Sequence, residues 1–220
     1  RVPDPLGGLA YTWPLYITAL VAYLIGSIPF GMLLARLAGH GDIREIGSGN
    51  IGATNVLRTG NKRLAALTLL LDAGKGWFST RAAGYWGPDA AVVAGLFAVL
   101  GHMFPVWLRF RGGKGVATVL GVIAGLAWPV ALASALAWLA VAALFRFSSL
   151  ASMVSIVAAP PLLAGMLWLQ RDGDLPYWLP GEPQHIELFA MLAVLVLLRH
   201  HGNIRRLITG QEPRIGQHKD

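Results

Sequence analysis

Long apolar segments alternate with short polar loops along almost the whole chain. The pattern predicts membrane-spanning helices at 14–38, 64–86, 89–108, 148–169 and 186–198. Crossing a hydrocarbon core of roughly 30 Å takes about 20 helical residues, a length that the last segment does not reach. Gly26 and Pro29 loosen the middle of the first segment, which membrane helices tolerate where neighbours satisfy the backbone. We therefore expect an all-α integral membrane protein.

Residues 116–145 form one apolar run that is too long for a single upright span. As one helix the run would measure about 45 Å, so it is either strongly tilted or broken near Trp128 and Pro129. Two crossings would place all the basic loops on one side of the membrane, and one crossing would separate them. Since basic loops favour the cytoplasm, we predict about seven spans, with the N-terminus outside and the C-terminus cytoplasmic. Three of these spans are short enough for partial insertion.

This topology sorts the charged loop residues by sign. The loops predicted to face the cytoplasm carry Arg44, Arg58, Lys62, Arg63, Arg109, Arg111, Lys114, Arg146, Arg199, Arg205, Arg206, Arg214 and Lys219. The loops predicted to lie outside carry Asp4, Asp89, Asp172, Asp174, Glu182 and Glu187, with Arg1 and Arg171 as their clear cations.

Composition narrows the class of protein further. With 55% hydrophobic and 13% charged residues, the chain is unlike an ordinary soluble domain, and we expect one membrane-embedded domain over 1–220. The net charge of +7 comes from cations beside apolar segments, so it indicates topology and anionic lipids or substrates, with no nucleic acid as partner. Residues 1–12 lack the basic and apolar regions of a cleavable signal peptide.

The sequence also lacks several kinds of catalytic chemistry. Without cysteine the chain has no disulfide, thiol nucleophile or cysteine metal site. HExxH and GxSxG motifs and clustered carboxylates are missing too, so we predict neither a metal, nor another cofactor, nor a serine-hydrolase triad.

The loop at 47–58 between the first two spans consists mostly of small and hydrogen-bonding residues. We expect its glycines to adopt positive φ and its successive N–H groups to form an anion-binding nest. The glycines, polar side chains and arginine concerned are Gly47, Gly49, Gly52, Ser48, Asn50, Thr54, Asn55 and Arg58. The loop alone is equally compatible with a phosphate pocket and with a mobile polar connector.

A second glycine-rich stretch, Gly112-Gly113-Lys114-Gly115, opens the segment at 116. It is unlike a Walker loop, because the spacing differs and Gly115 replaces the magnesium-binding hydroxyl. Lys114 beside exposed N–H groups at a helix start suits a phosphate, and the alternative is a simple marker of the cytoplasmic side.

Four further polar positions have two interpretations each. His200 and Asn203 are three residues apart, so they share a face if the last helix continues, and interface polarity is the alternative. Ser148 and Ser149 begin a span and either cap it or bind substrate. His201 is expected to be solvated.

Three ionisable residues fall inside or at the end of predicted spans. Asp72 and Lys75 are three residues apart within the second span, where an ion pair is the leading interpretation and substrate contact the second. His102, near the end of the third span, is read as packing or capping at least as readily as catalysis. Under the predicted topology, the segments that carry His102, the two glycine-rich loops and His200 all meet on the cytoplasmic side.

With these residues assembled, the chain resembles the bacterial glycerol-3-phosphate acyltransferases of the PlsY type. The resemblance spans essentially the whole chain and rests on three ordered motifs, at 47–58, 101–118 and 200–212. The Gly26-Ser27-Ile28-Pro29-Phe30-Gly31 run and the Asp72 to Gly76 stretch fit as well, whereas the loop at 170–186 is long for the family.

The resemblance implies a seven-span enzyme of the bacterial inner membrane with its active site facing the cytoplasm. It implies transfer of an acyl chain from acyl-phosphate, and from neither acyl-CoA nor acyl carrier protein, to the 1-hydroxyl of glycerol 3-phosphate. The products would be lysophosphatidic acid and inorganic phosphate. Carried over by position, the catalytic set is Ser48, Arg58, Lys114, His200 and Asn203. The phosphate cradle would comprise Gly49, Asn50, Gly52, Thr54, Asn55, Gly112, Gly113 and Gly115.

The residues agree with this chemistry and leave alternatives open. An acyl-phosphate is already activated, so no covalent enzyme intermediate is needed, and we hypothesise that the donor phosphate accepts the hydroxyl proton while His200 positions the acceptor. A transporter for an organic phosphate is the competing class, and a non-catalytic assembly factor is more distant. Nearly all candidate residues lie on one predicted face, which favours the enzyme. The oligomeric state is left open.

Overall fold

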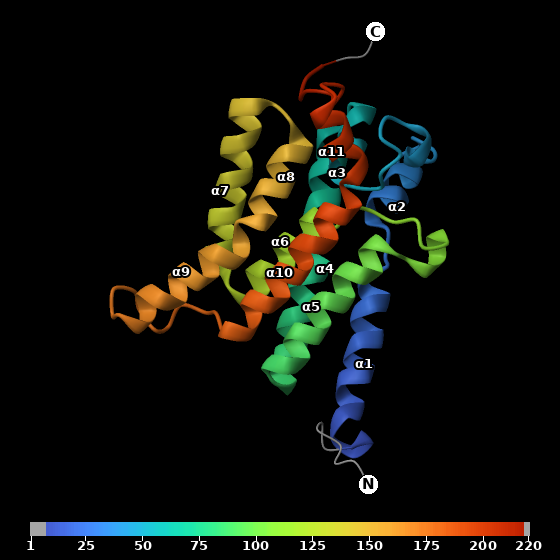
Figure 1. Cartoon of the computed structure of the whole chain (residues 1–220). Helices are drawn as coiled ribbons and strands as arrows, with labels where there is room; N and C mark the ends of the chain where they lie inside the picture. Colours follow the sequence, from blue (N-terminus) through green and yellow to red (C-terminus); the bar gives the residue numbers. More distant parts are fainter. Residues whose placement is uncertain (1–7, 218–220) are drawn as a thin grey trace.

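The structure is a computed structural model that describes residues 8–217, and these residues form helices and no strands (Figure 1). The α-helices are α1 (Leu9–Gly26), α2 (Phe30–Leu37), α3 (Ala53–Val56), α4 (Lys62–Ala83), α5 (Pro88–Met103), α6 (Val116–Leu126), α7 (Trp128–Phe145), α8 (Ser148–Val157), α9 (Ala159–Arg171), α10 (Pro183–Arg199) and α11 (His201–Ile208). Short 3-10 helices are η1 (Ile43–Glu45), η2 (Leu57–Thr59), η3 (Gly84–Trp86) and η4 (Val106–Leu108). The expectations for Arg1, Asp4, Lys219 and most of the first twelve residues lie outside the described residues.

The first predicted span is divided where the sequence places its helix breakers. Helix α1 ends at Gly26, and α2 begins after Pro29, whose ring nitrogen has no hydrogen to donate. Gly26 has a second role, since a Cβ there would overlap the backbone of Ala98 on α5. Helices α1 and α5 therefore approach each other closely through a residue without a side chain.

The apolar run at 116–145 is broken at the predicted place. Helix α6 ends at Leu126, Ala127 has an extended backbone with φ of −152°, and α7 starts at Trp128 with Pro129 in its first turn. Proline is favoured in a first turn because the N–H that it lacks would have no intrahelical partner there. The prediction of two helices over this run is confirmed.

Four helical segments are long and apolar enough to cross a membrane: Thr12–Leu37, Pro88–Leu108, Trp128–Phe145 and Ser148–Arg171. Helices α10 and α11 qualify only together, and they are bent by 63°. Helix α6 is shorter, with 11 residues, and α4 has the length but carries charged residues within it. The helical membrane fold is confirmed, whereas seven crossings and their orientation stay a prediction.

Helices α5, α6, α9 and α10 supply most of the main apolar core, with contributions from α7 and α8. Its large buried side chains include Met103, Val119, Ile123, Ile156, Leu188 and Phe189. Helix α4 packs against α6 through glycine, since a Cβ at Gly121 would overlap the carbonyl of Ala73. By contrast, α7 exposes Leu132, Leu136 and Leu139, as expected for a helix that faces lipid.

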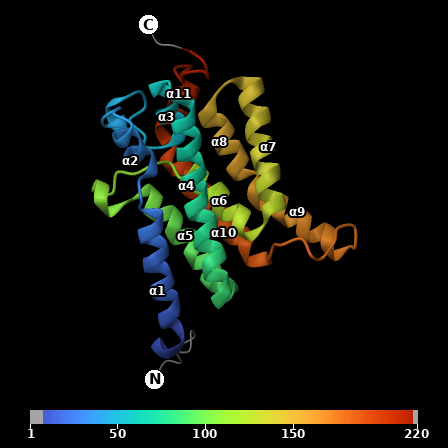
Figure 2. The ribbon, with the colours of Figure 1, turned by 180° about the vertical axis from the view of Figure 1, so that it is seen from behind.

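The polar loops collect toward one end of the helical bundle. Both views show the loop at 38–61, the turn between α7 and α8, and α11 at the same end (Figures 1 and 2). The start of α1 and the loop before α10 lie toward the opposite end. The glycine loop, which we define as residues 109–115, follows η4 at the side of the bundle below α2.

The predicted orientation can be tested in the cysteine-free chain, because any introduced thiol would be the only one. In intact bacterial cells we expect Tyr177→Cys, in the loop before α10, to react with a membrane-impermeant maleimide. Lys62→Cys, at the start of α4, should react only after the cells are opened. Both positions are exposed, and protein labelled in solubilised membranes serves as the control. Labelling of Lys62→Cys in intact cells would contradict the orientation.

Candidate functional site

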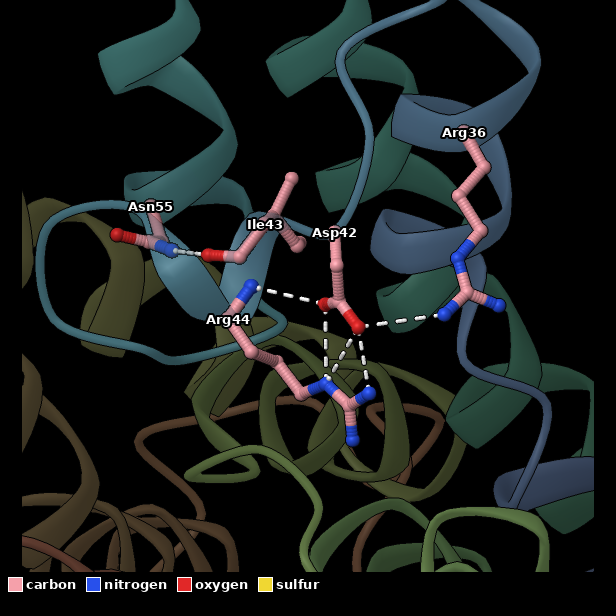
Figure 3. A network of polar contacts seen from close by, with 5 residues as sticks. All are labelled: Arg36, Asp42, Ile43, Arg44 and Asn55. Carbon is pink, nitrogen blue, oxygen red and sulfur yellow. Dashed lines mark hydrogen bonds and ion pairs between the residues drawn. The ribbon is translucent and has the colours of Figure 1, made fainter.

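The loop at 47–58 is held closed by the side chain of Asn55. This amide is buried, and its Nδ2 donates to the carbonyl of Ile43 at 2.7 Å (Figure 3). Its Oδ1 accepts from the backbone N–H and the hydroxyl of Ser48, at 3.1 and 3.3 Å. Asn55 therefore shapes the loop and orients Ser48, while the exposed side chains of Ser48, Thr54 and Arg58 remain accessible.

Asp42, just before this loop, pairs with two arginines (Figure 3). Its carboxylate accepts from Arg44 Nε at 2.9 Å and from Arg36 Nη2 at 3.2 Å, and it also caps η1 through the Arg44 N–H. The hydrogen bond and charge of Arg44 hold the pKa of Asp42 well below its usual range. The carboxylate is therefore ionised and offsets part of the positive charge of the two arginines.

The loop glycines divide into two kinds. Gly47 and Gly49 have positive φ, at 58° and 67°, as expected. Gly52 is extended, with φ of −85°, and precedes α3, so the expectation of positive φ is wrong there. A Cβ at Gly47 would overlap Nη1 of Arg58 and lie 2.5 Å from its Cδ. Gly47 is therefore the surface over which the Arg58 side chain passes.

The glycine loop is fastened to the end of α5. The N–H groups of Gly112 and Gly113 donate to the carbonyls of Met103 and His102, at 3.1 and 3.0 Å. These carbonyls lie in the last turn of α5 and have no partner within that helix. The expectation of exposed N–H groups is therefore wrong for these two glycines, because the helix end uses them. Among the three glycines of the loop only Gly115 has positive φ, which the loop residues Arg109 and Phe110 also adopt.

Arg199 holds the same loop from the other side. It donates to the carbonyls of Gly112 and Gly113 at 2.9 and 3.2 Å, and its guanidinium lies 5.3 Å from the centre of the Phe104 ring. The glycine loop thus receives hydrogen bonds through its carbonyls and gives them through its N–H groups. Both sets of contacts fix the backbone that leads into Lys114.

Lys114 joins a polar chain that runs through α11 to the C-terminal segment. Its Nζ donates to Asn203 Oδ1 at 2.5 Å, and Asn203 Nδ2 donates to Glu212 Oε1 at 2.6 Å. Glu212 also accepts from the hydroxyl of Ser149 at 2.5 Å and from Arg206 Nε at 2.7 Å. A donor on one side of Asn203 and an acceptor on the other decide which way its amide points, since the oxygen must face the Lys114 ammonium and the nitrogen the Glu212 carboxylate.

Charges around Lys114 show that the motifs converge. Burial and the positive charges of Arg206, Arg199 and Arg58 lower the pKa of Lys114 to about 8, although Glu212 opposes the shift. Arg58 comes from the loop at 47–58, Arg199 from the end of α10 and Arg206 from α11, and each is close enough to repel the ammonium. A dense positive field around one partly buried lysine is a suitable environment for a phosphorylated ligand.

His200 is buried at the junction of α10 and α11, beyond the last residue of α10. Its Nδ1 lies 2.8 Å from the carbonyl of Val196, which can only accept, so Nδ1 carries the hydrogen. Burial lowers the pKa of His200 to about 4, which keeps the ring neutral and its Nε2 an acceptor. The 63° bend replaces the continuous helix on which the shared face of His200 and Asn203 depended. His201 is exposed, as expected.

Two adjoining cavities open beside these loops. One, of about 490 Å³, is lined by Asp42, Arg44, Glu45, Gly49, Phe110, Arg111, Gly112 and Arg199. The other, of about 740 Å³, is lined by Ile28, Pro29, Met32, Leu33, Arg36, Arg44, Trp107, Leu108, Arg109 and Arg111. Arg44 and Arg111 line both, so a polar space and a largely apolar one meet at two arginines.

The structure brings many of the predicted site residues together and leaves others apart. Lys114, Asn203 and Ser149 belong to one hydrogen-bonded network, and Gly49 and Gly112 line one cavity. The Ser148 hydroxyl makes no hydrogen bond within the described residues. Of the predicted site residues, all of which the structure describes, only Gly49 and Gly112 line either cavity, so the predicted catalytic set lies outside both linings, as do Asn50, Gly52 and Thr54. Their predicted roles in binding remain predictions.

Sequence reasoning did not select several residues that organise the site, namely Arg44, Arg111, Arg199, Arg206 and Glu212. The arginines were read as markers of orientation, because spacing does not reveal which cation turns inward. Glu212 had a usable signal, since it is an isolated acid in a strongly basic C-terminal segment.

Gly47→Ala should weaken anion binding through Arg58. We expect affinity for sulfate, measured by calorimetry, to fall by about tenfold, because the new methyl group displaces one charged contact. Gly60→Ala is the matched control, since Gly60 also has positive φ but has open space around it. Both variants carry backbone strain of about 1 kcal/mol. Equal loss of affinity in the two would contradict a specific role for Arg58.

Sulfate binding should also depend on pH through Lys114. The ammonium is charged below its pKa and neutral above it, so affinity should fall by up to about tenfold per pH unit above pH 8. Sulfate stays dianionic across this range, and Lys114→Arg keeps its charge, so the variant should show a flat profile. The same alkaline decline in Lys114→Arg would assign it to another group.

Comparisons with known proteins agree with this arrangement. The family model described as glycerol-3-phosphate acyltransferase matches residues 16–210. A glycerol-3-phosphate acyltransferase of Mesorhizobium japonicum is 55% identical, with 93% of this chain and 98% of that protein aligned. A protein of the same name from Jannaschia sp. is 54% identical, over 91% and 93% of the two chains.

Solved structures give the same result. The crystal structure of PlsY (YgiH), an integral membrane glycerol 3-phosphate acyltransferase, in its glycerol 3-phosphate form has a TM-score of 0.80 and 38% identity, covering 92% of this chain and 96% of that one. The lysophosphatidic acid form has a TM-score of 0.78 and 37% identity, with the same coverage. The chain therefore belongs to the glycerol-3-phosphate acyltransferase family of integral membrane enzymes.

Proposed function

We propose that this enzyme transfers an acyl group from an acyl-phosphate to the 1-hydroxyl of glycerol 3-phosphate at the cytoplasmic face of the bacterial inner membrane. The products are lysophosphatidic acid and inorganic phosphate. The observation that carries the proposal is the junction, at Arg44 and Arg111, of a polar cavity with a largely apolar one. An acyl-phosphate has matching parts, a phosphate head directly attached to a long apolar chain.

The apolar cavity has the lining that an acyl chain requires. Six of its ten residues are Ile28, Pro29, Met32, Leu33, Trp107 and Leu108, and the remaining four are arginines. Burying a methylene group in such a lining contributes about 0.8 kcal/mol, so a long chain gains much of its binding energy there. The polar cavity, lined by both glycine-bearing loops and Arg199, then receives phosphate.

The reaction needs no covalent enzyme intermediate. The acceptor hydroxyl oxygen attacks the acyl carbon, the bond between that carbon and the phosphate oxygen breaks, and phosphate leaves with the bonding electrons. The hydroxyl proton passes to the departing phosphate, a group that titrates near pH 6 as a monoester and is therefore a competent acceptor. The atoms balance as one ester and one hydrogen phosphate.

Protein bases are poorly suited to take that proton. Hydrogen bonds from Ser149, Asn203 and Arg206 offset the effect of burial and keep the pKa of Glu212 below its ordinary value. Glu212 therefore stays a weakly basic carboxylate that is already occupied by three donors. His200 is also a weak base, because burial lowers its pKa, but its free Nε2 can accept a hydrogen bond from the acceptor hydroxyl.

The cationic residues supply charge stabilisation during transfer. Arg58 and Arg199 repel the Lys114 ammonium in the free enzyme, and together with burial, the larger cause, this repulsion lowers the pKa of Lys114. A bound phosphate relieves that repulsion. As negative charge develops on the departing phosphate, its attraction to the cations becomes stronger. Ser48, oriented by Asn55, offers a hydroxyl in the same loop as Arg58.

The donor is tested by incubating the detergent-purified enzyme with glycerol 3-phosphate and palmitoyl-phosphate. We expect stoichiometric release of phosphate and formation of lysophosphatidic acid, and no product from palmitoyl-CoA or palmitoyl-acyl carrier protein. Product from palmitoyl-CoA alone would overturn the donor assignment. Absence of turnover together with glycerol 3-phosphate uptake into proteoliposomes would support a transporter instead.

His200→Ala should separate positioning from proton transfer. We expect KM for glycerol 3-phosphate to rise by about tenfold, the loss of one hydrogen bond to a substrate, with kcat changed only a few-fold. His201→Ala is the matched control, because this neighbouring imidazole is exposed and should leave both constants unchanged. A collapse of kcat at saturating substrate with KM unchanged would identify His200 as the required base.

A further inference from the structure

Three buried ionisable residues lie beneath the glycine loop and have no part in the proposed chemistry. Asp72 and Lys75 on α4 and His102 on α5 are each at most 4% exposed. Lys75 Nζ lies 2.8 Å from Asp72 Oδ1, and His102 Nδ1 lies 3.5 Å from the same oxygen. Removing such charges from water costs several kcal/mol per ion, which makes this cluster an expensive way to stabilise a helical bundle.

Lys75 connects the cluster to the break in the first span. Its Nζ donates to the carbonyl of Ile28 at 2.9 Å and lies 5.6 Å from the centre of the Phe30 ring. Ile28 lies between α1 and α2, and it also lines the apolar cavity. Lys75 therefore donates a hydrogen bond to Ile28 and forms an ion pair with Asp72, whose charge it balances.

His102 connects the cluster to the glycine loop. Its carbonyl accepts from the Gly113 N–H at 3.0 Å, and a Cβ at Gly113 would overlap its Nε2. The imidazole thus forms the surface on which Gly113 rests, directly before Lys114. A rotation of this ring would move the loop backbone, because no side chain separates them.

Asp72 is the group that fixes the rotation of this ring. Within the described residues, Nδ1 of His102 has no hydrogen-bond partner, and the acceptor that lies closest to it in the cluster is the Asp72 carboxylate. The 3.5 Å separation is longer than a formed hydrogen bond, so the attraction is electrostatic and favours the ring with its Nδ1–H toward the carboxylate. Nε2 then faces Gly113.

We propose that Asp72 and His102 are positioning residues that act through Gly113 to hold the Lys114 ammonium where it meets the phosphate of glycerol 3-phosphate. This inference rests on the proposed function for the reaction that the enzyme catalyses. The positioning of Lys114 itself requires only that glycerol 3-phosphate binds through its phosphate. The route is contiguous: carboxylate, imidazole, glycine backbone, lysine. Beyond Lys114 lies Asn203, whose Oδ1 accepts a hydrogen bond from the Lys114 ammonium at 2.5 Å.

A double-mutant cycle tests whether Asp72 acts through Lys114. Glycerol 3-phosphate binding is measured by calorimetry for the full-length wild type, Asp72→Asn, Lys114→Ala and the double variant. We expect each single change to weaken binding about tenfold, and the double variant to bind within about twofold of Lys114→Ala. Independent effects that multiply in the double variant, or normal binding by Asp72→Asn, would overturn the proposal.

Two further variants keep the test decisive. Asp89→Asn is the matched control, because it removes an exposed carboxylate from the far end of the helix that carries His102, and it should bind normally. Where Asp72→Asn does not fold, His102→Gln replaces it in the cycle. Gln keeps an N–H for Asp72 and loses the ring under Gly113, so the same two outcomes decide.

The same four proteins are assayed for turnover with palmitoyl-phosphate. A wild type that binds glycerol 3-phosphate but does not turn over contradicts the donor assignment, while the binding cycle still decides the role of Asp72. In an active enzyme, Asp72→Asn should raise KM for glycerol 3-phosphate with little change in kcat. A loss of kcat in proportion to lost folded protein, with KM unchanged, would mean that the cluster is only structural.

Discussion

The carboxylate of Glu212 is the acceptor on which the polar end of the molecule depends. It receives hydrogen bonds from α8 through Ser149 and from α11 through Asn203 and Arg206. By engaging the Asn203 amide nitrogen it turns the amide oxygen toward Lys114. A segment beyond the last helix therefore determines how a lysine from the middle of the chain is held. Neutral or shorter side chains at this position would leave several donors without an acceptor, which is costly in a buried site.

The glycine loop supplies hydrogen-bond donors to the end of α5, where the last carbonyls have no partner within the helix. The last carbonyls of α5 need donors, and the N–H groups of Gly112 and Gly113 supply them. The loop carbonyls in turn accept from Arg199. The same hydrogen bonds therefore shape the loop and end the helix, and a substitution that disturbs the loop also disturbs the end of α5.

Periodicity and composition were sufficient for the helical membrane fold and the break before Pro129, since both follow from local chemistry. The convergence of the motifs was predicted by assigning the basic loops to the cytoplasmic side of the membrane. What spacing could not supply was the use of individual groups: the Gly112 and Gly113 N–H groups are consumed by α5, Gly52 is extended, and α10 bends at His200. Each depends on contacts between distant segments, as does the selection of Arg199 and Glu212 among many similar charges.

The contact between the two cavities at Arg44 and Arg111 has a kinetic consequence. On the proposed function, the donor never needs to leave the bilayer, because its chain can slide into the apolar cavity while its head reaches the arginines. Catalysis would then respond to the mole fraction of donor in the surrounding lipid or detergent, and dilution with inert amphiphile would slow the enzyme at constant bulk concentration. The water-soluble acceptor would be governed by ordinary molarity, so one enzyme would obey two concentration scales at once.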